Sequence, residues 1–308
     1  MSNTKTCLVL GANGFIGSHL VDELVEGGYK LRAIDRPNKT PKFKSSPQIE
    51  LLTGDISDKG FLAKALNGID YVFHCFSATT PASSDDDPYT DIDRNIKQSV
   101  QIFEECVEAK VKKIIFLSSG GATYGHIAEE RPAREEDAAT PVSPYGISKL
   151  AIENYLAYFN RKHGMEYIVY RLSNPYGPRQ AFRNSQGVIP AFLQQATGKG
   201  SLSVFGDGSA SRDYVYIRDV TRMIAESFAK QTQYPIYNLG SGTQTTINQL
   251  IEALKKALAK DLPVTYQEAP KTYLKNTAMS VERFTKEFGD HATTSLVEGL
   301  HETLRAAQ

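Results

Sequence analysis

The chain of 308 residues carries 35 Lys and Arg against 35 Asp and Glu, so its formal net charge at pH 7 is zero. This balance, without a long basic or acidic run, gives no indication of nucleic acid or an anionic membrane as a partner. Hydrophobic residues make up 41% and charged residues 23%, which is typical of a globular protein. The length suffices for one large domain or two smaller ones.

Cysteine usage and the N-terminal sequence give an expected location. Cys7, Cys75 and Cys106 are an odd number and form no Cys-x-x-Cys pair, so we expect buried free thiols in a reducing compartment. No apolar segment is long enough to cross a bilayer, and the N-terminus lacks a signal-peptide core. We therefore expect a cytoplasmic protein. The histidines show no metal-like spacing, so no metal is expected.

The first 35 residues predict a dinucleotide-binding unit. A short apolar strand over 5–10 enters a glycine turn at 11–17, and a helix and a second strand then lead to Asp35. The glycines permit close backbone approach, so the helix can direct its free N–H groups at a pyrophosphate. Asp35 can accept hydrogen bonds from the adenine ribose and would repel a 2′-phosphate. NAD is therefore favoured, although Arg36 leaves room for NADPH.

The alternation of strands and helices continues for about 140 further residues. We predict strands over 49–52, 71–74, 113–117 and 166–171 and helices over 61–66, 89–109 and 143–162. The acidic stretch 83–88 is expected to be a solvated turn. Repeated βα units at this spacing predict an α/β fold with a Rossmann-type doubly wound parallel sheet. Ligands bind at the carboxyl ends of such strands, which favours the loop 74–81.

The pattern changes after residue 173, where loops lengthen and strands shorten. The predicted elements there are strands over 202–205, 214–217 and 236–239 and helices over 190–197, 218–230, 247–259 and 295–306. We predict that residues 1–173 form the NAD-binding Rossmann domain, which also receives segments near 213–238. Residues 174–308 are predicted to form a smaller mixed substrate domain, with a cleft between the two.

Tyr145 and Lys149 are a candidate acid/base pair, because residues four apart lie on one face of a helix. Ser143 suits the N-cap of that helix, and Pro144 suits its first position. A neighbouring ammonium favours phenolate and lowers a tyrosine pKa that is ordinarily about 10. A pKa near 7 requires roughly 4 kcal/mol, more than one lysine is expected to supply. An oxidised nicotinamide would add a second cation. A Tyr and a Lys at this spacing are also consistent with two solvent-exposed helix residues that have no catalytic role.

Taken together, these features resemble the extended short-chain dehydrogenase/reductases, and within them the nucleotide-sugar epimerases of the UDP-glucose 4-epimerase type. The resemblance covers nearly the whole chain. It rests on GANGFIG at 11–17, Asp35, Asp55-Ile56, FLSSGGATYG at 116–125, Tyr145-x-x-x-Lys149, RLSNPYGPRQ at 171–180 and FGDGSASRDYVYIRDV at 205–220.

The resemblance implies a role for each matching position. The residues implied to bind NAD are Gly11, Asn13, Gly14, Phe15, Ile16, Gly17, Asp35, Arg36, Asp55, Ile56, Phe76, Ser77, Ala78, Asn95, Ser118, Tyr145 and Lys149. Those implied to bind the sugar nucleotide are Asn174, Arg212, Tyr214, Lys271 and Thr277. Tyr145 would be the acid/base, polarised by Lys149. The guanidinium of Arg212 suits a diphosphate because it forks onto phosphate oxygens.

The implied reaction is NAD-dependent 4-epimerisation of a UDP-hexose through a 4-keto intermediate, in polysaccharide biosynthesis. One alternative is a nucleotide-sugar reductase or dehydrogenase with net cofactor turnover. Another is a non-catalytic NAD(H)-binding regulator, against which the intact Tyr145 and Lys149 count. The resemblance also implies a homodimer that packs through the helices at 89–109 and 143–162.

The chain departs from the family beside the reacting hydroxyl. Gly120 stands where a Ser or Thr usually donates a second hydrogen bond, so Ser119, Thr123 or a water is expected to replace it. Relatives that eliminate water carry Asp-Glu at the next positions, and decarboxylating relatives keep a Glu there. Gly121 and Ala122 supply no such acid/base, which argues against both activities.

The C-terminal part bears on the size of the substrate. Lys271 stands where the family has a phosphate-binding Arg. Thr277 and Ala278 align near the residue that walls the sugar pocket, and both are small. Small residues there admit N-acetyl groups, so we expect UDP-GlcNAc/UDP-GalNAc to be accepted alongside or instead of UDP-glucose/UDP-galactose.

Overall fold

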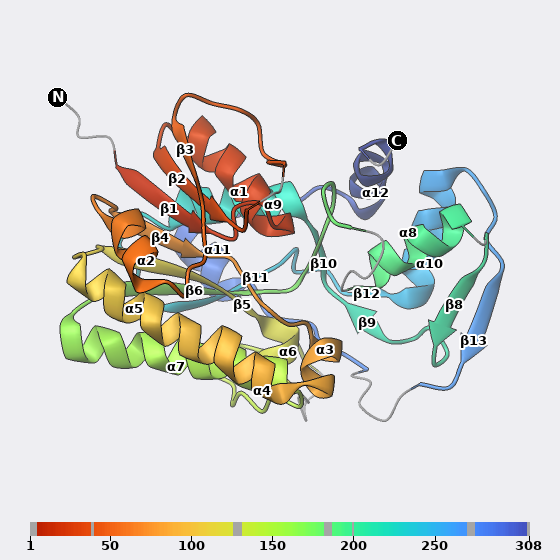
Figure 1. The fold of residues 1–308 in the computed structure, drawn as a ribbon. Coiled ribbons are helices and arrows are strands. Elements are labelled where there is room, and N and C mark those ends of the chain that lie inside the picture. The colour runs from red at the N-terminus through yellow and green to blue at the C-terminus, as the bar shows by residue number, and fades with distance from the viewer. Residues whose placement is uncertain are drawn as a thin grey trace.

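The architecture was taken from a computed structural model, which describes residues 5–37, 40–125, 131–181, 187–198, 200–269 and 275–306. Its centre is a seven-stranded sheet in the order β11-β6-β5-β4-β1-β2-β3, in which every neighbouring pair is parallel (Figure 1). The strands are β1 (Thr6–Leu10), β2 (Lys30–Asp35), β3 (Ile49–Thr53), β4 (Tyr71–His74), β5 (Lys113–Ser119), β6 (Glu166–Leu172) and β11 (Ile236–Leu239). The strand order reverses between β1 and β4, which makes that point the expected ligand crevice. The predicted Rossmann-type fold is confirmed.

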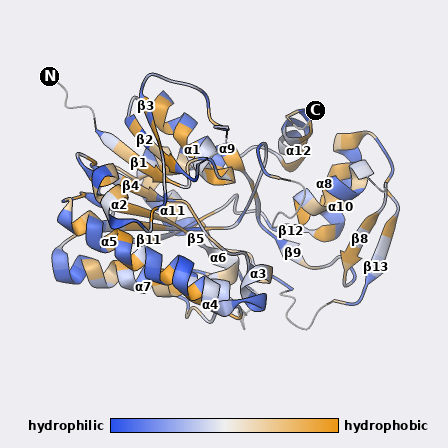
Figure 2. Ribbon diagram, viewed as in Figure 1, coloured by the Kyte–Doolittle hydropathy of each residue, from blue (hydrophilic) through white to orange (hydrophobic). Residues whose placement is uncertain are grey.

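Helices cover both faces of the sheet, so the strands are buried on each side. One face carries α1 (Phe15–Glu26), α9 (Ile217–Ser227) and α11 (Glu282–Phe288), and the other carries α2 (Lys59–Leu66), α5 (Gln98–Glu108) and α7 (Pro144–His163). The helices turn apolar stripes inward and polar faces outward (Figure 2). Leu20 and Ile224 belong to the first core, whereas Phe103 and Leu156 belong to the second. Burying each such side chain contributes about 1.5–3 kcal/mol.

The acidic stretch at 83–88 is largely exposed, as predicted, but it lies in two short helices that meet at Asp87, so the prediction of a turn is wrong. It forms α3 (Pro81–Asp86) and α4 (Pro88–Asp91), each started by a proline in its first turn. Thr80 caps α3 in a reciprocal capping box with Ser83, and the Asp87 carboxylate caps α4 by accepting from the Thr90 N–H. A π-helical turn, η1 (Ile92–Lys97), then leads into α5. The polar side chains taken as loop formers are therefore helix caps.

A smaller unit follows β6. It contains α8 (Val188–Gly198), α10 (Ile247–Leu258) and α12 (Leu296–Arg305), with the paired strands β8 (Leu202–Phe205) and β13 (Val264–Gln267), β7 (Asn174–Tyr176) and β10 (Tyr214–Tyr216), and β9 (Ser211–Arg212) and β12 (Thr245–Thr246). These elements enclose a core of their own. Between them the chain returns to the large sheet, where β11 pairs with β6. No helix within the described residues is long and apolar enough to span a membrane.

Candidate active site

In the turn after β1, the backbone approaches other atoms so closely at Gly11 and Gly17 that neither position has room for a side chain. Gly11 has a φ of +78°, and a Cβ on it would lie 3.0 Å from the Cβ of Phe76. A Cβ on Gly17 would lie 2.2 Å from the Gly11 carbonyl oxygen, while Gly14 is the exposed residue before α1. Phe15 begins α1 and Ile16 follows it, both partly buried. The turn and the N-terminus of α1 thus form a cradle that a pyrophosphate can approach closely.

Asn13 connects this turn to the end of β2. Its backbone N–H donates to Asp35 Oδ2 at 2.8 Å. Its side chain donates to the Thr40 carbonyl at 2.9 Å and accepts from the Lys42 N–H at 2.7 Å. The Asp35 carboxylate is therefore held beside the glycine turn. The exposed Arg36 follows it and donates its own N–H to Asp35 Oδ1 at 2.7 Å.

The other residues expected around the cofactor lie on loops at the same edge of the sheet. Asp55 is exposed and Ile56 is partly buried after β3. After β4, the Ala78 N–H donates to Asn95 Oδ1 at 2.8 Å, which ties that loop to η1. Phe76 stacks on His74 with ring centroids 4.3 Å apart, and Ser77 is exposed. All these positions follow the carboxyl ends of parallel strands.

The candidate acid/base pair, Tyr145 and Lys149, lies on the first turns of α7. The Ser143 hydroxyl accepts from the Gly146 N–H, and the Tyr145 N–H donates to Ser84 Oγ at 3.1 Å. Lys149 is only 7% exposed. Its Nζ donates to the Leu117 carbonyl at 3.1 Å and lies 5.6 Å from the centre of the Tyr145 ring. Burial of Lys149 excludes the reading of two solvated helix residues.

Burial moves the pKa of both members of the pair. It raises the pKa of Tyr145 to about 12, with a further increase from the Asp91 charge and a decrease from a hydrogen bond with the Ser119 side chain. Burial lowers the pKa of Lys149 to about 8, against the opposing charges of Cys75, Glu153 and Asp91. The phenol is therefore protonated at neutral pH in the protein alone. Phenolate requires the additional positive charge that an oxidised nicotinamide supplies.

The second hydrogen-bonding position is built differently from the family pattern. Ser119 ends β5 and precedes the short helix α6 (Gly120–Tyr124), and its side chain lies beside Tyr145 and lowers the pKa of that phenol. Thr123 is fully buried, and its Oγ1 has no hydrogen-bond partner within the described residues. A Cβ on Gly120 would stand 1.7 Å from Met279 Sδ. Met279 therefore occupies the space that a side chain at 120 would need.

We expect Gly120→Ser to destabilise the protein by about 1–3 kcal/mol, because the added Cβ overlaps the sulfur of Met279. In the double variant Gly120→Ser/Met279→Ala, the change in unfolding free energy should differ from the sum of the two single changes by at least about 1 kcal/mol. The reason is that the smaller side chain at position 279 removes the overlap. Urea unfolding of the four proteins of the cycle measures this. Gly198→Ser is the control, because nothing lies within 4 Å of an added Cβ there. Strictly additive free energies would contradict the predicted overlap.

A buried ion pair that the sequence patterns did not indicate lies behind the candidate acid/base pair. Arg171 Nη2 lies 2.6 Å from Glu153 Oε2, and both side chains are at most 5% exposed. Ser118, implied as a cofactor residue, donates to Glu153 Oε1 at 2.5 Å and is buried. The Arg171 guanidinium also lies 4.8 Å from the centre of the Tyr124 ring. Well-paired buried charges fix geometry more than they add stability, so this pair aligns β5, β6 and α7.

The expected substrate residues lie on the small strands beside this edge. Asn174 begins β7, and its Nδ2 donates to the Asp213 carbonyl at 3.1 Å. Arg212 is in β9, where its Nη1 donates to the Ser211 carbonyl at 2.7 Å and the Lys275 carbonyl at 3.3 Å. Tyr214 begins β10 and is buried. Sequence reasoning did not indicate the buried carboxylate of Asp213, which binds the turn after β11.

Thr277 is buried and lies against α6, where a Cβ on Gly121 would stand 3.4 Å from the Thr277 Cβ. The expected pocket wall is therefore next to the active-site helix. Lys271 lies outside the described residues. Within those residues, no group of three His, Cys, Asp or Glu side chains could hold a metal ion.

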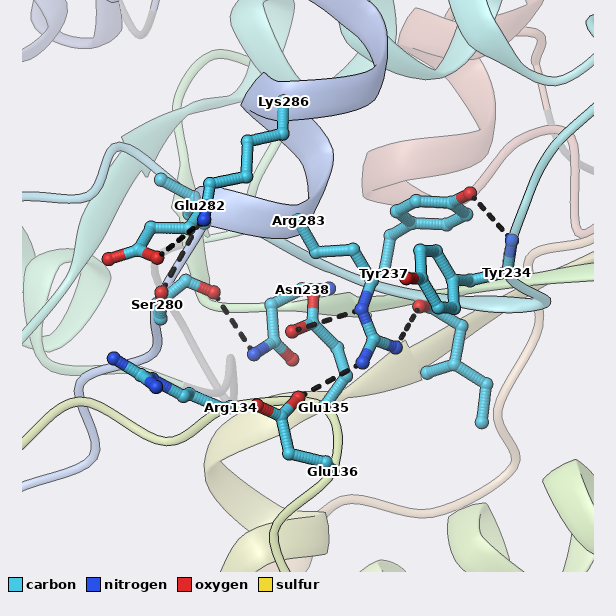
Figure 3. Close-up of polar contacts among 12 residues, drawn as sticks. Arg134, Glu135, Glu136, Tyr234, Tyr237, Asn238, Ser280, Glu282, Arg283 and Lys286 are labelled. Atoms are coloured by element: carbon cyan, nitrogen blue, oxygen red, sulfur yellow. Dashed lines mark hydrogen bonds and ion pairs between the residues drawn. The ribbon is translucent and has the colours of Figure 1, made fainter.

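A polar cluster on the far side of α6 anchors the segment that carries Met279. The Tyr124 hydroxyl donates to Asn238 Oδ1 at 2.7 Å. Asn238 lies in β11, and its Nδ2 donates to the Ser280 carbonyl at 3.1 Å while its N–H donates to Glu135 Oε1 at 2.8 Å. Figure 3 shows Asn238 directed at Ser280 and Arg283 reaching toward Glu136. Through these hydrogen bonds Asn238 links α6 to the segment that contains Glu135 and to the segment that contains Ser280.

The site thus combines a glycine-lined dinucleotide cradle with a tyrosine–lysine pair at one edge of a Rossmann-type sheet. This combination is that of an enzyme that uses a nucleotide cofactor, with Tyr145 as the candidate acid/base. The chain belongs to the NAD dependent epimerase/dehydratase family, whose model matches residues 7–240. NAD is its cofactor. The predicted family resemblance is confirmed.

Individual relatives agree with the family and differ in reaction. The chain is 36% identical over 249 residues to a putative UDP-glucose 4-epimerase of Methanocaldococcus jannaschii, which covers 80% of this chain and 81% of that one. The crystal structure of UDP-glucose 4-epimerase from Thermotoga maritima with UDP-glucose superposes with a TM-score of 0.90 at 34% identity over 98% of both chains. An Escherichia coli dTDP-4-dehydro-6-deoxyglucose reductase is 30% identical over 314 residues, 97% of this chain and 96% of that one.

Proposed function

We propose that this protein catalyses 4-epimerisation of a UDP-hexose through a 4-keto intermediate, with NAD regenerated in each turnover. The observation that carries the proposal is the Tyr145–Lys149 pair, in which Lys149 is buried and Tyr145 partly buried, with Ser119 beside the phenol and no acid at Gly121 or Ala122. An elimination reaction needs a second acid/base beside the sugar, which these two positions lack.

The chain's own residues suit each proton movement of this reaction. Bound NAD supplies the hydride acceptor and, after reduction, the hydride donor. Tyr145 as phenolate takes the proton from the C4 hydroxyl, stabilised by the Lys149 ammonium, and later returns it. Ser119 donates a hydrogen bond to the reacting oxygen. The Ser119 side chain lies beside the phenol, so both side chains can bond a hydroxyl placed between them.

Inversion also requires that the sugar turn over without leaving the protein. Arg212 and Asn174, on β9 and β7, are the proposed contacts to the diphosphate. A guanidinium suits that role because it forks onto phosphate oxygens. A tether at the diphosphate leaves the keto sugar free to present its opposite face. The small, buried Thr277 beside Gly121 favours acceptance of N-acetylated hexoses.

The decisive experiment is incubation of the purified protein with UDP-glucose, UDP-galactose, UDP-GlcNAc and UDP-GalNAc, followed by NMR of the products. No cofactor is added. We expect C4 epimers to appear while the bound NAD content stays constant. A failure to convert the N-acetylated pair while UDP-glucose is converted would overturn the substrate-size proposal alone. A deoxy or dehydrated product would overturn the reaction itself.

A second candidate is a nucleotide-sugar reductase with net cofactor turnover. It is favoured by the similarity to the Escherichia coli reductase, which extends over 97% of this chain. The same incubation, with added NADH and a 4-keto nucleotide sugar, distinguishes the two. Stoichiometric consumption of NADH would identify a reductase, whereas an epimerase interconverts its substrates without consuming the cofactor.

We also propose that the protein is a homodimer that pairs through α7 and η1. Large apolar side chains stand exposed on these elements: Ile92 is 51%, Ile147 53% and Tyr158 42% exposed. An exposed apolar patch of this kind indicates a protein contact. Tyr158→Asp is expected to give a monomer by light scattering, and Tyr266→Asp, on β13, should leave the mass unchanged. A dimer that survives Tyr158→Asp would refute this interface.

A further inference from the structure

Asp91 is a completely buried carboxylate beside the proposed catalytic pair, at the end of α4. Its Oδ1 accepts from the Thr79 hydroxyl and, at 2.8 Å, from Asn95 Nδ2, while its Oδ2 accepts from the Ser148 hydroxyl. None of the ion pairs among the described residues includes Asp91. Burying a charge costs several kcal/mol unless other groups satisfy it, so three neutral donors are directed at this one carboxylate.

The three donors come from three different parts of the active site. Thr79 lies on the loop after β4 that is expected to line the cofactor, and Asn95 lies in η1 and also binds the Ala78 N–H of that loop. Ser148 is in α7, directly before Lys149. All three are at most 7% exposed. The carboxylate therefore joins the cofactor loop to the helix that carries Tyr145 and Lys149.

The charge of Asp91 acts on both members of the pair. It favours the ammonium of Lys149 and opposes ionisation of Tyr145. The other titratable groups that face Lys149 are Cys75 and His74 at the end of β4 and Glu153 in α7. Glu153 is already paired with Arg171, and burial raises the pKa of Cys75 to about 12, so that thiol is neutral at pH 7. Asp91 thus adds a negative charge near Lys149 that no ion pair among the described residues neutralises.

We infer that Asp91 is a positioning residue whose carboxylate holds the helix of Tyr145 and Lys149 against the cofactor loop and places a buried negative charge beside that pair. The inference rests on the proposed acid/base role of Tyr145. It makes two separable statements, one about the charge and one about the hydrogen bonds. Asp91→Asn removes the charge and keeps the shape. Ser148→Ala removes one hydrogen bond, and Thr79→Val removes two, the one donated to Asp91 and the one accepted from Asn95 Nδ2; both variants keep the charge.

The charge is tested by titrating the phenolate absorbance of the NAD-bound protein and subtracting the same titration of its Tyr145→Phe counterpart. We expect Asp91→Asn to lower the midpoint of Tyr145 ionisation by about one pH unit, because a nearby negative charge no longer opposes the phenolate. Ser148→Ala should leave the midpoint within a few tenths of a unit. An unchanged midpoint in folded Asp91→Asn would overturn the charge statement. This readout needs no substrate, so it holds even if no UDP-sugar is converted.

The positioning role of the Asp91 hydrogen bonds is tested by measuring turnover with whichever UDP-sugar the wild-type protein converts. Ser148→Ala and Thr79→Val are expected to lower kcat about tenfold with KM nearly unchanged, because the pair is misplaced while substrate contacts remain. Both are small changes, so they remain informative if Asp91→Asn does not fold. Wild-type kcat in both variants, or a loss confined to thermal stability, would overturn the positioning role.

Discussion

Tyr145→Phe is expected to lower kcat by at least about 10³-fold while leaving NAD bound, because the hydroxyl is the proposed acid/base and the ring only fills its pocket. The Tyr145 hydroxyl sits against Ser119 and its ring beside Lys149, so the variant keeps the packing and loses only the proton carrier. Turnover by NMR and the NAD content released on denaturation are the two measurements.

Tyr155→Phe provides the matched control, since Tyr155 lies on the same helix and is 41% exposed. It should retain the wild-type kcat and NAD content. Substantial turnover by Tyr145→Phe would mean that another group, of which Thr123 is the nearest buried candidate, carries the proton. A loss of NAD from Tyr145→Phe would instead assign the hydroxyl a cofactor-binding role.

The sheet was predictable because each strand is a short apolar run and each is followed by a glycine or polar turn. The turn at Gly11–Gly17 is the clearest case, since steric contact of Gly17 with the Gly11 carbonyl permits only glycine there. Local sequence also identified the cap of α7 at Ser143, because N-caps act on the next few residues. These features are determined by residues close to one another in the chain, so the local sequence pattern is enough to predict them.

The parts that sequence did not reveal depend on contacts between distant residues. The Asp91 carboxylate is satisfied by Thr79 and Ser148, which no local pattern connects to it. In the sequence, Gly120 indicates only that a hydrogen-bond donor is missing. The fold shows that Met279 occupies the space that a side chain at position 120 would need. The acidic stretch was taken for a turn because the same polar residues cap helices and form loops. The sequence therefore did not indicate the contacts that join segments far apart in the chain around the candidate site.

Lys149→Met is expected to abolish most activity and to make the protein without cofactor more stable. Burial lowers the pKa of Lys149 to about 8 from an ordinary value of 10.5, so holding this ammonium inside the fold costs about 3 kcal/mol at neutral pH. Loss of the Lys149 hydrogen bond to the Leu117 carbonyl costs about 1 kcal/mol, which offsets part of the stability gained by removing the charge. Methionine fills a similar volume without charge, so the net gain at pH 7 is about 2 kcal/mol.

The sign of the pH dependence follows from the same pKa. The unfolded chain binds the lysine proton up to about pH 10.5 and the folded one only up to about pH 8, so wild-type stability rises with pH between these values. The difference in unfolding free energy between Lys149→Met and wild type should therefore shrink from pH 7 to pH 10 in urea titrations. In activity, loss of the cation raises the pKa of Tyr145, so kcat should fall about 10²-fold or more at pH 7 and recover partly at higher pH. A stability difference that does not change with pH would show that the folded protein holds this ammonium without cost.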